Sequence, residues 1–159
     1  MILRRFLPRL SRLALAATGV AAILSASLAA CSEDAGPTAS SGTTVSVDLN
    51  EWAFSASATS APAGLITFRA KNKGSQTHEL VLFKSDLAPA DLPVDEEGAV
   101  DERGVGLELI DEVEHVKPGQ TKEFSADLKP GKYVMACNLI ENGQRHFMNA
   151  MYGQFTVKA

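Results

Sequence analysis

Hydrophobic and polar residues alternate in short stretches through most of the chain. Val45, Val47 and Leu49 are separated by polar residues, the period of two that is typical of a half-buried β-strand. Apolar, β-branched or aromatic residues predict further strands, which are bounded by Gly- and Pro-containing turns and lie at 65–70, 78–83, 121–128, 132–137 and 153–157. Short strands separated by such turns indicate an all-β sandwich or barrel.

Two segments are too long to be ordinary turns of a sandwich. Residues 85–116 contain eleven Asp or Glu residues and a single Arg, and we expect them to form an acidic loop insertion. Residues 138–152 connect two expected strands, although hairpin loops usually have two to five residues. Loops of this length are usually functional or disordered, and this one contains two of the candidate ligands considered below.

The first thirty residues have the pattern of an export signal. Four arginines lie within residues 1–12, and the mainly Ala and Leu segment from Leu13 to Ser32 carries no charge. The run ends in Leu28-Ala29-Ala30-Cys31, which resembles the lipobox of bacterial lipoproteins. That resemblance implies removal of residues 1–30, lipidation of Cys31, a flexible tether over 31–43 and anchoring outside the cytoplasm, on a bacterial membrane. A membrane-spanning helix is the alternative interpretation.

Composition and charge restrict the class of the remaining domain, residues 44–159. The 159-residue chain is 45% hydrophobic and 21% charged, which is enough for one core and excludes a disordered chain or a coiled coil. A net charge of −4 argues against a nucleic-acid partner. Two cysteines are too few for a disulfide scaffold, and lipidation of Cys31 would leave Cys137 as the free thiol.

Soft metal ligands are concentrated around the second long connection. Cys137, His146 and Met151 are spaced C-x8-H-x4-M. A trigonal site of two His and one Cys with a weak axial Met is the blue-copper electron-transfer site. The second His could be His78, which begins an expected strand, whereas we expect His115 on the surface. Each residue also has a common structural role, as a buried small hydrophobe, a core filler or a hydrogen-bonded His.

Three segments resemble the cupredoxin family of blue copper proteins: residues 72–78 (NKGSQTH), 130–137 (PGKYVMAC) and 146–157 (HFMNAMYGQFTV). The resemblance implies a Greek-key β-sandwich with one type 1 copper ion, held by His78, Cys137 and His146 with Met151 as the axial ligand. Plastocyanin-like sites have two residues between Cys and His, whereas eight residues separate Cys137 from His146 here. This spacing is similar to that in the blue-copper domain of copper nitrite reductases. A second set of His ligands is missing, so reductase activity is not implied.

The resulting expectation is a membrane-tethered one-electron carrier that is not an enzyme. His146 would be the exit for the electron, with Phe147 and Met148 as an apolar contact patch. The acidic insertion is either a solvated loop or a docking surface for a basic redox partner, through Asp95, Glu96, Glu97, Asp101 and Glu102. The alternatives are an exported copper chaperone or store, for which Met135 and Met148 would be extra ligands, and a metal-free extracellular binding sandwich.

Overall fold

A computed structural model describes residues 42–159. The expected Cys31 lipidation site, the signal segment and most of the tether lie outside this range. The described chain contains one short 3-10 helix, η1 (Pro89–Asp91), and eleven strands: β1 (Thr43–Asn50), β2 (Ala53–Ala56), β3 (Ser60–Pro62), β4 (Gly64–Asn72), β5 (His78–Lys84), β6 (Glu108–Val116), β7 (Thr121–Leu128), β8 (Gly131–Ala136), β9 (Ile140–Glu141), β10 (Gln144–Arg145) and β11 (Tyr152–Lys158).

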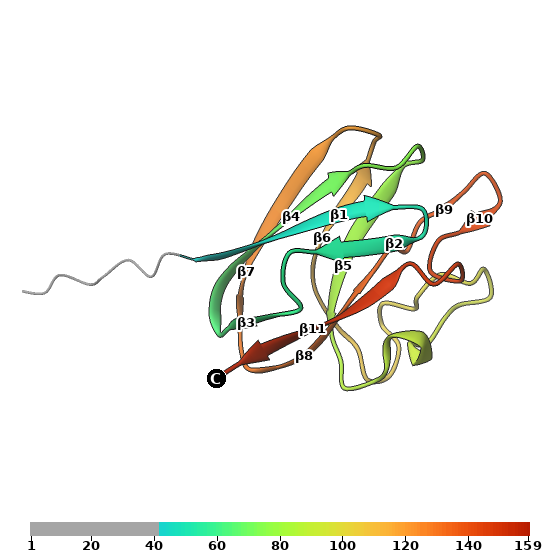
Figure 1. The fold of residues 1–159 in the computed structure, drawn as a ribbon. Helices are drawn as coiled ribbons and strands as arrows, with labels where there is room; N and C mark the ends of the chain where they lie inside the picture. Colours follow the sequence, from blue (N-terminus) through green and yellow to red (C-terminus); the bar gives the residue numbers. More distant parts are fainter. Residues whose placement is uncertain (1–41) are drawn as a thin grey trace, which may run out of the picture. The chain divides into compact units, whose positions relative to one another are not determined.

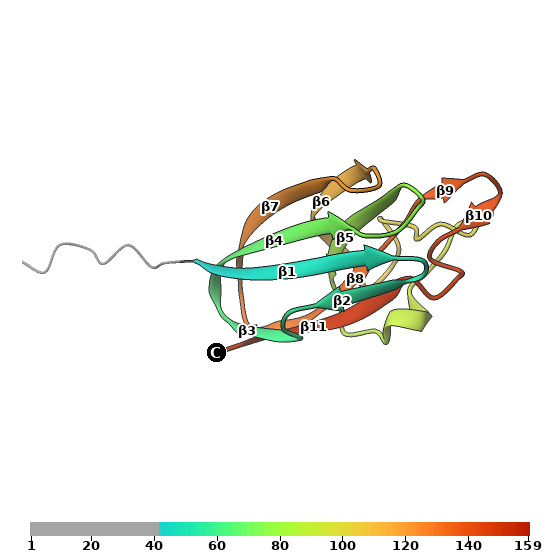
Figure 2. The same cartoon turned by 45° about the horizontal axis from the view of Figure 1, so that its top comes forward.

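The strands form the expected β-sandwich (Figures 1 and 2). One sheet has the order β2-β1-β4-β7, and the other has the order β3-β11-β8-β5-β6. Most neighbours in a sheet are not consecutive in the chain, and β1–β4 and β3–β11 are parallel pairs. The all-β Greek-key prediction is therefore confirmed. Among the described residues, no helix is long and apolar enough to cross a membrane.

Alternating residues fill the space between the two sheets. Val45, Val47 and Leu49 of β1 are fully buried, as their period of two predicts. Phe68 of β4 stacks on Phe124 of β7 at a centroid separation of 5.3 Å and meets Phe155 of β11 edge-on at 5.2 Å. Ring pairs in these arrangements stabilise a core beyond their buried area, so they help to fix the spacing of the two sheets.

Only part of the acidic segment is a loop, which corrects the expectation for 85–116. Residues 108–116 are strand β6, which pairs with β5 at the edge of its sheet. The preceding residues cover the outer face of this sheet, because Leu92 and Val100 are buried in a second apolar cluster with Val81 and Phe83 of β5. The insertion is thus acidic on its solvent side and apolar beneath.

The long connection after Cys137 contains a small hairpin that was not expected. Strands β9 and β10 pair through Glu141 and Gln144, and the two residues between them are Asn142 and Gly143. Both have positive φ values, 54° and 76°, as a two-residue type I′ hairpin turn requires. Eight residues separate Cys137 from His146, and without the hairpin this segment would be loosely held. The hairpin brings the two ends of the segment closer together.

Candidate metal centre

Strand directions bring three chain segments to one end of the sandwich, on the right in Figures 1 and 2. β5 and β11 both run antiparallel to β8, so each begins beside the end of β8. His78 is the first residue of β5, Cys137 directly follows β8, and Met151 directly precedes β11. Residues far apart in the chain therefore meet because of sheet register alone.

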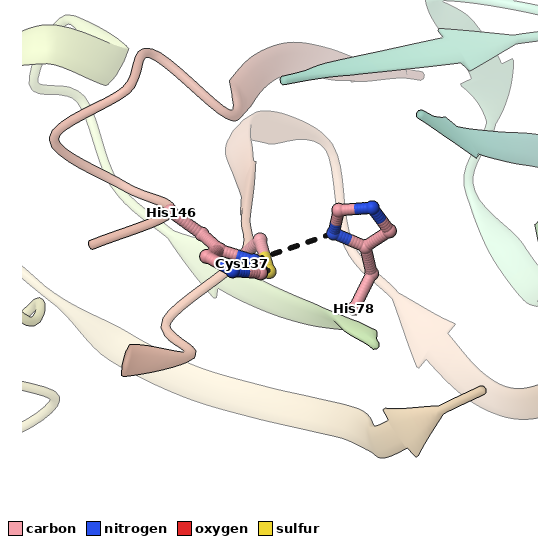
Figure 3. A group of neighbouring side chains, drawn as sticks. All are labelled: His78, Cys137 and His146. Atoms are coloured by element: carbon pink, nitrogen blue, oxygen red, sulfur yellow. Dashed lines mark hydrogen bonds between the residues drawn. The ribbon is translucent and has the colours of Figure 1, made fainter. Parts of the chain in front are cut away.

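The structure brings His78, Cys137 and His146 together (Figure 3). One ligand atom from each lies within 4.8 Å of the others. The Cys137 Sγ is 3.2 Å from Nδ1 of His146, and this nitrogen is 3.3 Å from Nδ1 of His78. All three side chains are fully buried. His115, in contrast, is exposed on β6 and does not belong to the cluster.

Backbone hydrogen bonds hold the loop that carries His146 and Met151. The His146 N–H donates to the Leu139 carbonyl at 3.1 Å, and the Met151 N–H donates to the His146 carbonyl at 3.1 Å. The Cys137 N–H donates to the carbonyl of Met151 at 3.0 Å, and the Met151 side chain is fully buried. Met151 is thus fixed beside Cys137 through its backbone, whereas Met148 is 58% exposed.

The segment before His78 is organised by the side chain of Asn72, which is fully buried. Its amide nitrogen donates to the carbonyls of Gln76 and Val116, both at 2.7 Å, and its oxygen accepts from the Gly74 N–H at 2.8 Å. These three bonds satisfy a buried polar group that would otherwise be costly. They shape the turn that delivers His78 to the cluster.

The electrostatics of the cluster favour neutral imidazoles and a protonated thiol when no cation is bound. Burial lowers the pKa of His78, although the hydrogen bond and charge of Glu51 oppose it. Burial, with His78 nearby, lowers the pKa of His146. Burial raises the pKa of the Cys137 thiol to about 12, against the hydrogen bond that the Glu79 N–H donates to the sulfur at 3.4 Å. A cation in the cluster is what would stabilise the thiolate here.

Glu79 lies directly after His78, and its side chain is largely buried. Burial raises its pKa to about 7, and the negative charges of Glu112, Glu114 and Glu102 add to this effect against a hydrogen bond from the Asn138 N–H. Its own backbone N–H donates to the Cys137 sulfur, so this bond does not use the side chain of position 79.

The donor set fits a single copper ion. Two imidazole nitrogens and one sulfur converge in a buried, apolar setting, which is the trigonal set that type 1 copper uses. Carboxylate-rich sites for Mg²⁺ or Ca²⁺ take oxygen ligands instead, and the cluster offers none. The fit rests on the donor atoms and their burial.

Comparison with known proteins agrees with this geometry. The sequence profile of the Cupredoxin-like domain matches residues 15–148. The chain belongs to the cupredoxin family. A search of curated protein sequences returned no match.

Solved cupredoxin structures share the fold. Reduced auracyanin from Roseiflexus castenholzii is 25% identical, with a TM-score of 0.55 over 74% of this chain and 98% of that one. Auracyanin A, described as a blue copper protein from Chloroflexus aurantiacus, is 22% identical, with a TM-score of 0.50 over 74% of this chain and 99% of that one. The domain therefore spans nearly the whole length of these proteins.

Two residues at the site were missed by sequence reasoning. Glu51 and Trp52 form the corner between β1 and β2, at the same end of the sandwich as the ligands. The Glu51 carboxylate lies 3.2 Å from Nε2 of His78. The Trp52 ring meets the His146 ring at a centroid separation of 4.7 Å and the His78 ring at 6.1 Å. The available signal was the chain's single Trp at the point where the strand alternation stops.

The contact patch expected around His146 is wrong in part. The His146 side chain is fully buried and Phe147 is only 4% exposed, because Phe147 packs in the second apolar cluster and against Tyr152. Met148 is exposed, as is Ile140 in the same loop. Trp52, which is half-buried, packs its ring against the buried imidazole of His146, which we expected to be the exit for the electron.

Proposed function

We propose that the cupredoxin domain is a one-electron carrier with a type 1 copper site. The observation that carries the proposal is the buried convergence of His78, Cys137 and His146 at the end of a rigid sandwich. Bound copper supplies the Cu(I)/Cu(II) couple. The protein keeps the two imidazoles and the sulfur in fixed positions, so that little rearrangement accompanies a change of charge. Met151 is proposed as the axial ligand.

The route of the electron to the surface passes, in this proposal, from His146 to Trp52. Burial of His146 removes the direct contact with a partner that an exposed imidazole edge would give. Trp52 lies edge-on against both histidines and is itself half-buried, so its ring links the buried imidazoles to the surface at this corner. A partner that docks over Trp52 would then be separated from the ligands by one ring.

The visible spectrum of the copper-loaded protein tests the proposed function. We expect an intense thiolate-to-copper band in the wild type and its complete loss in Cys137→Ser, with the β-rich circular dichroism kept in both. His78→Ala should also lose the band, and His115→Ala is the matched control that should keep it. A coloured Cys137→Ser protein, or a colourless wild type that binds copper, would overturn the type 1 assignment.

We also propose that the domain is exported and held at a membrane through lipidated Cys31. The support is the order of the basic segment, the apolar segment and the lipobox-like residues 28–31. Cys31→Ser should leave the protein unprocessed or release it into the soluble fraction. A processed Cys31→Ser protein that remains bound to membranes would contradict the lipid anchor.

A further inference from the structure

The carboxylate of Glu51 is bound into the site by three hydrogen bonds that all end on one oxygen. Its Oε1 accepts from the N–H groups of Ser75 at 2.7 Å and Gln76 at 2.8 Å, and it lies 3.2 Å from Nε2 of His78. The Glu51 side chain is 26% exposed, while the His78 side chain is fully buried. The contact therefore reaches from the surface into the ligand cluster.

The local fold keeps this carboxylate in place. Glu51 follows the end of β1, and the turn that it binds is the one shaped by Asn72 just before His78. Gly74 of that turn leaves room for the carboxylate, because a Cβ at this position would overlap the Glu51 side chain. The turn and the carboxylate fit each other, so the contact with His78 is part of the built structure of the corner.

The contact selects one tautomer of His78. The Glu51 Oε1 already accepts from the backbone N–H groups of Ser75 and Gln76, so it acts as a hydrogen-bond acceptor at this position. An ionised carboxylate only accepts hydrogen bonds, so Nε2 of His78 must carry the proton. The lone pair is then on Nδ1, the nitrogen turned toward Cys137 and His146 in Figure 3.

The two imidazoles of the cluster are held unequally. His146 has a buried Nε2 with no hydrogen-bond partner in the described part of the chain. A metal-binding His usually donates its second N–H to a carboxylate, carbonyl or water, which orients the ring and makes it a stronger donor. His78 has such a partner in the Glu51 carboxylate, whereas Nε2 of His146 has none among the described residues and the His146 ring packs against the rings of Trp52 and His78.

We propose that Glu51 is a positioning residue that fixes His78 as a ligand through Nδ1 and, through its charge, favours the oxidised state of the copper site. A negative charge next to one ligand stabilises Cu(II) more than Cu(I), because the interaction grows with the positive charge of the centre. The carboxylate should therefore lower the reduction potential. This inference rests on the proposed type 1 site.

Glu51→Gln separates the charge from the hydrogen bonds. Because all three bonds end on Oε1, the amide oxygen of the E51Q side chain can accept them, and only the charge is lost. Changes next to a ligand typically cost 10- to 100-fold in metal affinity. We expect E51Q to lose Cu(II) affinity about tenfold more than Cu(I) affinity, which corresponds to a potential about 59 mV higher for a one-electron couple.

Asp48→Asn is the matched control. Asp48 lies on β1, shortly before Glu51 in the chain, and forms an ion pair with Lys73 at 2.6 Å, so its replacement removes an equal charge from the neighbouring strand without touching a ligand. The D48N potential should stay near that of the wild type. An E51Q potential equal to that of the wild type, or a D48N shift as large as the E51Q shift, would overturn the charge role.

Nitrogen NMR of the copper-free protein tests positioning without the metal. The wild type and E51Q should show His78 as the single Nε2–H tautomer, whereas Glu51→Ala should show both tautomers. An Ala variant that keeps the single Nε2–H form would overturn the positioning role, and circular dichroism identifies a variant that fails to fold. A wild type without the visible band would refute the type 1 site instead, and the tautomer result would stand apart from it.

Discussion

Two methionines lie in the loop that follows Cys137, and their burial separates their roles. Met151 is fully buried and its carbonyl is bound to the Cys137 N–H, whereas Met148 is 58% exposed. A thioether above the trigonal ligands is a weak donor whose identity tunes the reduction potential. The burial of Met151 and its backbone bond to Cys137 support the proposal that Met151, rather than Met148, is the axial ligand.

Replacing Met151 with Leu should raise the reduction potential of the copper-loaded protein by tens of millivolts while the visible band remains. The reason is the loss of a sulfur that supports Cu(II), and voltammetry measures the shift. The swap nearly conserves volume, so the free energy of unfolding should fall by less than about 1.5 kcal/mol. Met148→Leu is the control, and a shift in that variant alone would point to the wrong methionine.

The residues of the site could be predicted from the sequence only where they lie close together in the chain or follow a recognisable motif. Cys137, His146 and Met151 share one segment, and His78 follows a turn-forming sequence, so spacing and the family resemblance suffice for them. Glu51 lies 27 residues before His78 in the chain. The pairing of β1 with β4 brings the corner of Glu51 and Trp52 to the end of the sandwich where the cluster lies. The single Trp marks this corner as unusual in the sequence, but one sequence does not indicate which distant residues it contacts.

At the scale of elements, alternation identified β1 and β4 but concealed β6. In β6 the charged residues are as many as the apolar ones, because an edge strand exposes one face and one row of backbone groups to solvent. Its buried residues, Val113 and Val116, are three apart, so the period of two is broken. The Asn142-Gly143 pair was a readable hairpin signal, and overlooking it made the ligand loop appear longer than it is.

The acidic loop is also a structural element, which its charge alone did not indicate. Leu92 and Val100 pack onto the sheet beside Phe147, the neighbour of His146. Asn138, next to Cys137, donates to the Val100 carbonyl at 3.1 Å and to the Glu102 carboxylate at 3.2 Å. The loop therefore supports the ligand segment from outside.

Leu92→Ala should lower the free energy of unfolding by about 2 to 4 kcal/mol, because Leu92 is 4% exposed and its removal leaves a cavity beside the sheet. Urea denaturation measures the change. Val105→Ala serves as the control, since Val105 is 94% exposed in the same loop and should change stability by less than about 0.5 kcal/mol. Equal free energies of unfolding for the two variants would show that the loop is only a solvated segment and does not stabilise the fold.

At the scale of the whole molecule, the exposed charges of the loop create a negative surface near the ligand segment. Asp95, Glu96, Glu97 and Asp101 are exposed and Glu102 is half-buried. Electron-transfer encounters bury little area and depend on steering for their rate. A basic redox partner is therefore the kind that this surface would attract.

The electron-transfer rate with a cationic partner should fall steeply with ionic strength. Clustered charge raises association rates by about 10- to 10³-fold at low salt, and the effect fades as the Debye length shortens to about 10 Å at 0.1 M. Replacing the five acids with their amides should flatten the salt dependence in stopped-flow measurements and leave the visible spectrum unchanged. An unchanged salt dependence in that variant would remove the docking role.

Burial of the proposed ligands also decides which oxidants can reach the centre. Each of His78, Cys137, His146 and Met151 is fully buried, so a small molecule has no free approach to the metal position through the described surface. Dioxygen and azide react with copper by binding to it, whereas a protein partner needs only to come close to it.

The reduced protein should accordingly persist in air, and azide should leave the spectrum of the oxidised protein unchanged. Trp52→Ala should introduce azide-dependent bands that Trp52→Phe does not, and an azide-sensitive wild type would show that the aromatic cover opens. The tryptophan that we propose as the electron route to the surface would thus also keep the reduced carrier from passing its electron to dioxygen.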